Sequence, residues 1–380
     1  MDNIAGHKSS LTWAVHISVV VLVALWLFPT VGLLVSSFRT ADQIATSGWW
    51  SSLSQQERQN PAIRLEGAEV LDGGLYVIEG ALFPGLEAEV SAWGTSSRAP
   101  EAYAPGETAE LTKGRTVTVD AAGNFRMTAE TSQEGARLPR VFTTATTPPE
   151  FTLENYRQVL GGGSGTDDMS RAFISTLTVT VPATIIPIVV AAFAAYALAW
   201  MDFPGRALLV AFVVGLLVVP LQLALIPLLK LHLGIGIGKG YLGVWLAHTG
   251  FGLPLAIYLL RNYMVGLPRD IIENARVDGA TEFQIFTKII LPLSFPALAS
   301  FAIFQFLWTW NDLLVAKVFL IDSTGRTTVM TNQIVELLGT RGGNWEILAT
   351  AAFVSISVPL VVFFAMQRYL VRGLLAGSVK

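Results

Sequence analysis

Six stretches of this chain contain no Asp, Glu, Lys or Arg, and each is long enough to cross a lipid bilayer. A spanning helix needs about 20 apolar residues, and it satisfies its own backbone hydrogen bonds where no water can do so. The sequence therefore predicts an all-α polytopic membrane protein with six transmembrane helices. The six stretches are Leu11–Phe38, Ala172–Met201, Ala207–Leu229, Gly240–Leu260, Ile289–Asn311 and Ile347–Gln367.

The composition agrees with a membrane protein and excludes several other classes. Charged residues make up 14% of the chain, against about 25% in ordinary soluble domains. A formal net charge of −3 gives no sign of the basic surface that nucleic-acid binders carry, so no nucleic-acid partner is expected. The chain has no cysteine, which excludes disulfides, thiolate metal sites and cysteine nucleophiles.

The histidines are too scattered to form a metal or nucleophile cluster. Of the four (His7, His16, His232 and His248), His16 and His248 fall in predicted spans, and each is interpreted as a lone histidine without a nearby carboxylate. Such a residue is more often packed or hydrogen-bonded than part of a proton relay. We therefore expect no metal site and no catalytic residue.

Lys and Arg near the spans indicate the orientation, because they are enriched in short cytoplasmic loops. The first span is too long for a cleavable signal peptide and is expected to be retained. With the N-terminus inside, nine basic residues are cytoplasmic and four are outside, so both termini and the loop 261–290 are predicted to be cytoplasmic. The nine are Lys8, Arg206, Arg261, Arg269, Arg276, Lys288, Arg368, Arg372 and Lys380, and the four are Lys230, Lys239, Arg326 and Arg341.

A polar insertion of residues 39–171 separates the first two predicted spans. Apolar and polar residues alternate in LYVIEGALF (75–83), RTVTVDA (115–121) and NFRMTAE (124–130), as in half-buried β-strands. The pair Gly73-Gly74 and the glycine of VDAAGNFRM are turn signals. The alternation favours an extracytoplasmic β-rich domain over the alternative, a poorly ordered loop.

These features divide the chain into four parts. The cytoplasmic N-terminus and the first transmembrane helix occupy residues 1–38, and the insertion domain occupies residues 39–150. Residues 151–171 begin with FTLENYRQVL and predict an amphipathic lead-in. Residues 172–380 form a five-helix core that contains the cytoplasmic loop 261–290.

The loop predicts two short helices joined at a glycine. Glu273 lies in an early turn of the first helix, where a carboxylate favours the helix dipole, and Gly279 follows the last residues of that helix as a C-cap would. Thr281 and Gln284 fit a capping box that starts the second helix. An apolar stripe follows at spacings of three and four: Phe283, Phe286 and Ile290.

Such an elbow has two interpretations. It can be a rigid protrusion that fits a groove of a partner protein, or an amphipathic helix that lies at the lipid interface. Interfacial helices usually carry more basic residues than Lys288 alone provides. Physical chemistry alone leaves both interpretations open.

The segment ENARVDGATEFQIFTKIILPLSFPAL (273–298) resembles the cytoplasmic signature loop of ABC-importer permeases. Asn274 is the one departure, because the family usually has alanine there, and asparagine lowers helix propensity only slightly. The matching residues are Glu273-Asn274-Ala275, Asp278-Gly279-Ala280, Phe286 and Pro292-Leu293.

Further segments resemble the second permease subunit of maltose-type carbohydrate importers. The resemblance covers roughly residues 11–40 and 150–380. The insertion departs from the usual second subunit, whose corresponding loop is short, and is similar to that of alpha-glucoside importer permeases. The segments are FTLENYRQVL, AAYALAWMDFPGR, PLQLALIPLL, LAHTGFGLPLAIYLLRNY, LWTWNDLLVA and QRYLVRGLLAGSVK.

The resemblance implies the type I ABC-importer permease fold and a non-catalytic subunit. Such a subunit carries a sugar or oligosaccharide, here an alpha-glucoside or maltose-like sugar, into the cytoplasm by alternating access. The implied partners are a homologous second permease subunit in a heterodimer, two ABC ATPase subunits and an extracytoplasmic sugar-binding protein. The implied location is the bacterial inner membrane. ATP and Mg would be bound by the ATPase, and no cofactor by this chain.

By the same resemblance, the elbow 273–290 would be the coupling helix, seated in a cleft of the ATPase. Gly279 would permit the sharp turn, Asp278 would fix the elbow, and the face with Phe283 and Phe286 would be gripped. The expected coupling residues are Glu273, Ala275, Asp278, Gly279, Ala280, Phe283, Phe286 and Pro292.

The fifth predicted span carries the candidate sugar path. Phe301, Phe304, Trp308 and Asn311 share one helical face, and Gln305, Thr309 and Asp312 line an adjoining face. Rings stack on the C–H faces of sugars while amides and carboxylates bind hydroxyls, but the same side chains also join helices to one another, and that alternative stays open. One further candidate, Gln222, lies near Pro220 in the third span. The full set of candidates is Gln222, Phe304, Gln305, Trp308, Asn311 and Asp312.

Two other classes fit less well. A secondary transporter should carry ionisable residues in mid-span or broken helices in matched halves, whereas Asp312 alone lies near the edge of a span. If Asp312 and Lys317 form a pair, it is expected to be a structural contact. A structural scaffold would not need a capped elbow. The permease interpretation is therefore favoured.

Overall fold

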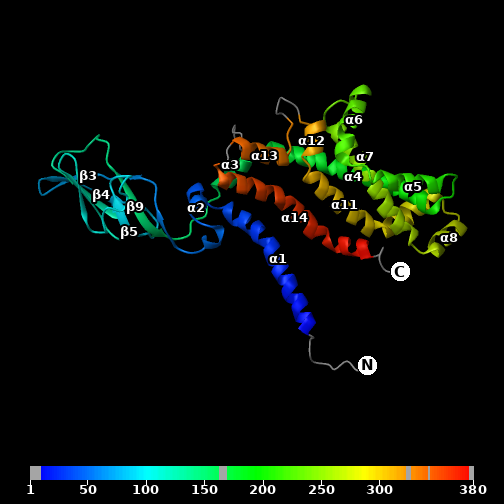
Figure 1. Cartoon of the computed structure of the whole chain (residues 1–380), viewed down its shortest axis with the longest axis horizontal. Helices are drawn as coiled ribbons and strands as arrows, with labels where there is room; N and C mark the ends of the chain where they lie inside the picture. Colours follow the sequence, from blue (N-terminus) through cyan, green and yellow to red (C-terminus); the bar gives the residue numbers. More distant parts are fainter. Residues whose placement is uncertain (1–9, 162–168, 322–326, 341–342, 376–380) are drawn as a thin grey trace. The chain divides into compact units, whose positions relative to one another are not determined.

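The computed structural model describes residues 10–161, 169–321, 327–340 and 343–375. It divides into two compact units, residues 1–153 and residues 154–380 (Figure 1). Part of the predicted lead-in 151–171, residues 162–168, lies outside the described residues.

The first unit contains an apolar helix, two short helical segments and two antiparallel sheets. Its elements are α1 (Ser10–Ser36), α2 (Ala41–Thr46), η1 (Trp49–Ser51), β1 (Gln56–Gln59), β2 (Ile63–Arg64), β3 (Glu69–Asp72), β4 (Leu75–Ala81), β5 (Glu89–Gly94), β6 (Thr108–Leu111), β7 (Arg115–Val119), β8 (Asn124–Ala129) and β9 (Arg140–Thr147).

The two sheets share one apolar core. One sheet has the order β3-β4-β8-β7-β6, and in the other β9 pairs with β1, β2 and β5. Trp93 and Ala145 from the second sheet and Val117 and Met127 from the first are fully buried together. The strands predicted at 75–83, 115–121 and 124–130 are confirmed as β4, β7 and β8. The predicted turns are also confirmed, since their glycines have positive φ.

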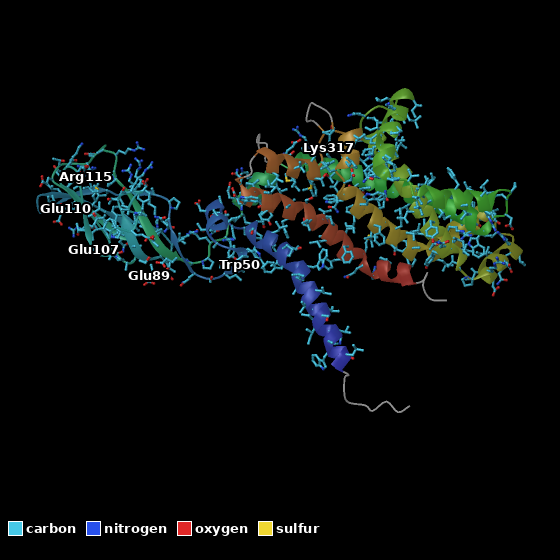
Figure 2. The ribbon with its side chains drawn as sticks, in the orientation of Figure 1. Trp50, Glu89, Glu107, Glu110, Arg115 and Lys317 are labelled. Carbon is cyan, nitrogen blue, oxygen red and sulfur yellow. The ribbon has the colours of Figure 1, made fainter. Side chains whose placement is uncertain are left out.

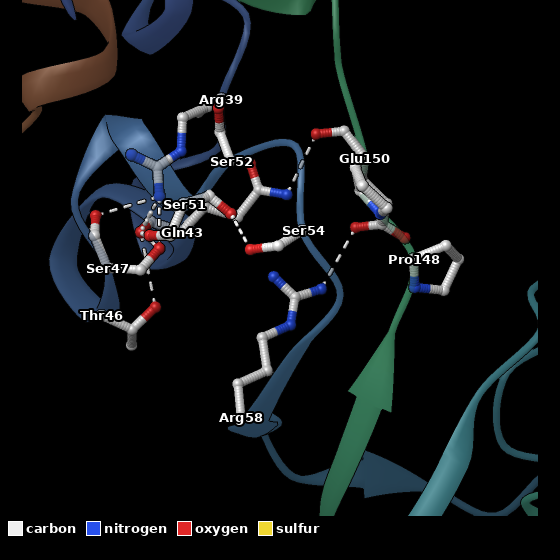
Figure 3. Close-up of a pocket in the computed structure, with 11 residues that line it drawn as sticks. Arg39, Gln43, Thr46, Ser47, Ser51, Ser52, Ser54, Arg58, Pro148 and Glu150 are labelled. Carbon is white, nitrogen blue, oxygen red and sulfur yellow. Dashed lines mark hydrogen bonds and ion pairs between the residues drawn. The ribbon is translucent and has the colours of Figure 1, made fainter.

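A neck, defined here as residues 37–58 with residues 148–152, connects α1 to the sheets. Arg39 is buried, and its Nη2 donates to Gln43 O at 2.6 Å and to Ser47 O at 3.0 Å. Gln43 Nε2 donates to Glu150 O at 3.1 Å, and Arg58 forms an ion pair with Glu150 at 3.2 Å (Figure 3). These bonds fasten the chain entering the sheets to the chain leaving them.

The regular elements in the described residues of the second unit are all helices. Its elements are α3 (Glu154–Leu160), α4 (Ser170–Trp200), α5 (Arg206–Leu216), α6 (Leu221–Gly234), α7 (Tyr241–Val265), α8 (Arg269–Val277), α9 (Glu282–Ile285), η2 (Phe286–Ile290), α10 (Leu291–Leu293), α11 (Phe295–Trp310), α12 (Leu314–Phe319), α13 (Met330–Thr340) and α14 (Trp345–Leu375).

Four described helices are long and apolar enough to cross a membrane: α1, α4, α7 and α14. The expectation of one helix over Ala207–Leu229 is wrong, because α5 and α6 meet at 107°. Pro220 explains the break, since it lacks an N–H and disfavours helix in the residue before it. The stretch Ile289–Asn311 is also broken, by a 69° bend before α11.

The long helices pack as a bundle. α4 packs against α7 and α11, and α11 packs against α14 (Figure 1). Arg276 Nη2 donates to Trp200 O at 3.4 Å, which places α8 at the C-terminal end of α4. Met330 N donates to Thr176 Oγ1 at 2.9 Å, which places α13 near its N-terminal end.

Candidate functional site

The elbow between α8 and α9 is closed by local hydrogen bonds. Gly279 has φ +80°, a conformation that side chains with a Cβ rarely adopt. Gly279 N donates to Arg276 O at 3.0 Å and Ala280 N donates to Ala275 O at 2.9 Å, as in a Schellman motif. The predicted role of Gly279 as a C-cap is confirmed.

The second arm of the elbow starts with the predicted capping box. Gln284 N donates to Thr281 Oγ1 at 3.3 Å, and Thr281 N donates to Gln284 Oε1 at 2.8 Å. The arm continues as a π-helical turn, η2, in which Leu291 N donates to Phe286 O. Such turns often occur at functional sites.

Glu282 ties the elbow to the membrane bundle. Its Oε2 accepts a hydrogen bond from Tyr196 Oη of α4 at 2.5 Å, and its Oε1 accepts one from Arg276 Nε of α8 at 3.0 Å. The bond to Glu282 raises the pKa of the Arg276 guanidinium. One carboxylate therefore joins both arms of the elbow to the end of a spanning helix.

The family resemblance implied this fixing role for a different carboxylate, that of Asp278. Asp278 is exposed, and among the described residues only its backbone N–H is recorded in a hydrogen bond, to Asn274 O. Glu282 was missed because Tyr196 precedes it by 86 residues. An acidic residue in the first turn of a capped helix was the only local signal.

The expected apolar stripe is confirmed for Phe286 and Ile290, which are both buried, and is wrong for Phe283, which is exposed. Phe286 is 3% exposed, and its ring packs 4.6 Å from Phe193 and 5.2 Å from Tyr196. Ile285 and Phe286 together centre the buried face, and Phe283 lies about a third of a turn away from it. Phe286 therefore fills the chain's own core and is not available to a partner.

The exposed surface of the elbow has a different composition. Phe283 is 65% exposed and Val277, which the sequence did not single out, is 86% exposed. Ala275 and Ala280 are half-buried against the core, whereas Glu273 is exposed. Pro292, beyond η2, is exposed as well.

The candidate path residues of α11 divide between two environments. Phe304, Trp308 and Asn311 are exposed. Phe301, which was expected on the same face, is buried, so only part of that face is exposed. Trp308 lines an apolar hollow of about 510 Å³ beside the α5–α6 bend, together with Leu217 and Pro254.

Gln222 lies outside the residues that line this hollow. It is exposed in the first turn of α6, directly after the bend.

Gln305 is buried between three helices. Its Nε2 donates to Ala183 O of α4 at 3.1 Å, and it lies against Gly252 of α7, where a Cβ would be 2.6 Å from its Oε1. Its side chain is 1% exposed. These contacts support the alternative role for Gln305, a contact between helices.

Asp312 is a buried helix cap. Its carboxylate accepts hydrogen bonds from Ala316 N at 3.0 Å and Val315 N at 3.3 Å, at the start of α12. It also lies 3.7 Å from His248 Nε2, so the expectation that His248 has no nearby carboxylate is wrong. Lys317 is exposed. The Asp312 carboxylate contacts the start of α12 and His248 in place of the structural pair expected with Lys317.

The comparisons with known proteins agree with these features. Residues 166–375 match the family described as "Binding-protein-dependent transport system inner membrane component". The chain belongs to this family. As a permease of this family it is a non-catalytic membrane component of an ABC importer, and its membrane-spanning part has the type I importer permease fold.

Two relatives of this permease differ in how much of it they cover. The alpha-glucoside transport system permease protein AglG of Rhizobium meliloti is 62% identical over 382 residues, which cover 99% of each chain. The osmoprotective compounds uptake permease protein GgtD of Synechocystis sp. is 58% identical over 231 residues, or 61% of this permease and 76% of the relative. The alignment with AglG therefore includes the insertion domain.

A solved bacterial ABC transporter involved in the import of the acidic polysaccharide alginate contains a similar chain. It is 17% identical to this permease, with a TM-score of 0.46, and the match covers 59% of this permease and 85% of that chain.

Proposed function

We propose that this permease carries an alpha-glucoside or maltose-like sugar from the periplasm to the cytoplasm. The observation that carries the proposal is the match with AglG, which is named for alpha-glucoside transport and is 62% identical over 99% of both chains. The exposed face of Phe304, Trp308 and Asn311 is the proposed sugar path, because it offers aromatic rings beside an amide.

The permease works, in this proposal, with a homologous second permease subunit, two ABC ATPases and a periplasmic sugar-binding protein. ATP and Mg bind to the ATPases, and this chain supplies the elbow that they contact. Val277 and Phe283 form the apolar contact, and Glu282 transmits its movement to α4 through Tyr196. The exposure of Val277 and Phe283 supports the apolar contact. The hydrogen bond from Tyr196 to Glu282 supports the transmission of movement to α4.

The proposed orientation places the elbow end of the bundle in the cytoplasm. Ser300 Oγ donates to Tyr369 O at 3.0 Å, so the last part of α14 lies with the elbow near the end of α4. Gly240 N donates to Phe319 O at 2.7 Å, which places Lys239 toward the other end of the bundle.

Four residues used for orientation lie outside the described residues: Lys8, Arg326, Arg341 and Lys380. Six spans result if each bent pair counts as one.

Sugar uptake tests the proposed substrate. The permease is reconstituted with its partner subunits and binding protein in proteoliposomes, and ATP-dependent uptake of radiolabelled maltose is measured against unlabelled competitors. Trehalose and other alpha-glucosides should compete strongly and arabinose weakly. Uptake of arabinose without maltose would contradict the assignment.

The elbow contact is tested by Phe283→Asp, with Leu338→Asp in α13 as a matched control. Both side chains are more than half exposed, at 65% and 52%, but they lie at opposite ends of the bundle. The first variant should insert into the membrane and lose both ATPase co-purification and uptake. The control should keep both. Equal behaviour of the two variants would contradict the proposed contact.

A further inference from the structure

Three aromatic side chains gather beside the C-terminal turns of α1. The ring centroids of Phe28 and Trp49 are 4.6 Å apart, and those of Trp49 and Trp50 are 6.2 Å apart. Gly32 makes room for this packing, because a Cβ there would lie 2.6 Å from Trp49 Nε1. The chain after α1 therefore turns back alongside the helix.

The position of this cluster along α1 corresponds to a membrane boundary. The 27 residues of α1 extend about 40 Å, whereas the hydrocarbon core is about 30 Å thick. Phe28 precedes the last helical residue, Ser36, by about 12 Å of helix. If the apolar helix fills the core, Phe28 and Gly32 lie where hydrocarbon gives way to head groups.

The segment 47–54 has the composition of an interfacial segment. Its sequence SGWWSSLS contains no charged residue. Trp50 is 70% exposed and Leu53 is 79% exposed. Trp50 is labelled in Figure 2. Tryptophan is enriched at membrane–water interfaces because its ring is apolar and its N–H is polar.

The neck turns the positive charge of Arg39 away from this surface and holds the segment in place. Arg39 is turned inward onto Gln43 and Ser47, at the start of the segment (Figure 3). Thr152 N donates to Phe38 O at 2.7 Å, and Gln43 binds Glu150 O. The segment is thus part of a loop whose two ends are held together by hydrogen bonds. This loop sets the positions of Trp49 and Trp50.

We propose that residues 47–54 lie in the phospholipid head-group layer beside the C-terminal end of α1, with Trp49, Trp50 and Leu53 as anchors. The occupant is lipid because the exposed side chains continue the apolar surface of α1, which itself lies in the bilayer. The base of the β-domain is then fastened to the membrane surface, since β1 begins two residues after Ser54.

The absence of cysteine from the chain allows a direct test. Leu53→Cys carries a nitroxide label in the full transporter, reconstituted in vesicles of phosphatidylethanolamine and phosphatidylglycerol. Leu71→Cys in β3 is the matched control, because Leu71 is a similarly exposed leucine, at 64%, on the β-domain. Collisions of each label with oxygen, which enters lipid, and with a water-soluble nickel chelate are measured by power saturation.

The expected result is a ratio of oxygen to nickel collisions several-fold higher at position 53 than at position 71. Equal ratios would overturn the proposal and place the segment in water. Protection of position 53 from both reagents would also overturn it, in favour of a partner protein covering the segment. A label at Trp50→Cys should give a ratio of oxygen to nickel collisions as high as that at position 53. A ratio as low as that at position 71 would contradict the role of Trp50 as an anchor.

Discussion

Tyr196, near the end of α4, donates a hydrogen bond to Glu282, the first residue of α9, at 2.5 Å. The same carboxylate is bound by Arg276 of α8. A spanning helix and both arms of an exposed elbow therefore meet at one side chain. This gives the elbow a hydrogen-bonded connection to the bundle, which the proposed contact with the ATPase requires.

Removing the Tyr196 hydroxyl tests this connection. Tyr196→Phe should lower stability by about 1 kcal/mol, the typical net value of one hydrogen bond. The ring should keep its packing on Phe286, so the fold should persist while uptake per ATP hydrolysed falls. Thermal unfolding and coupled ATPase and uptake assays measure both effects. Tyr258→Phe in α7 is the control, and an equal loss of coupling there would contradict the role of the hydroxyl.

Phe283 and Phe286 should separate partner binding from folding. Phe286→Ala removes a buried ring and should cost about 3–5 kcal/mol of stability. Phe283→Ala changes an exposed residue and should alter stability by only about 0.5 kcal/mol, while weakening ATPase co-purification. Thermal unfolding and pull-down measure the two effects. A folded Phe286→Ala variant that selectively loses the ATPase would restore the expectation of a shared stripe.

Gly252 and Gln305 should be strongly coupled. Gly252→Ala places a Cβ 2.6 Å from Gln305 Oε1, and overpacking of this kind costs about 1–3 kcal/mol. Adding Gln305→Ala should recover much of the loss, because it removes the group that is struck. A double-mutant cycle by thermal unfolding measures the coupling. Strictly additive effects would mean that the two residues do not interact.

Arg39 should stabilise the neck. Burial lowers the pKa of its guanidinium, but its two bonds to backbone oxygens hold the turn closed. Arg39→Ala should cost about 2 kcal/mol, since hydrogen bonds from charged groups exceed the neutral value. Hydrogen exchange of residues 41–54 should then accelerate. Arg98→Ala, at an exposed arginine, is the control, and unchanged exchange in both variants would contradict the role of Arg39.

Several features could be predicted from the sequence because their causes lie within a few residues. The uncharged stretches predicted spanning helices, alternation predicted β4, β7 and β8, and Gly279 with Thr281 and Gln284 predicted the turn of the elbow. Backbone conformation, caps and burial periodicity all act over one or two turns of chain. The signature loop also carried the family resemblance, which the match over residues 166–375 confirms.

Other features were decided only by tertiary structure. The stretch Ala207–Leu229 was expected to be one helix, but the structure divides it into α5 and α6 at an angle of 107°. The spacing of Phe283 and Phe286 could not show which one faces α4, and sequence distance concealed the meetings of Glu282 with Tyr196 and of Asp312 with His248. The sequence alone determined the four long apolar helices and the turn at Gly279, because these depend on local chemistry. Which side chains remain exposed to a partner depends on packing between segments far apart in the chain, and only the folded bundle decided it.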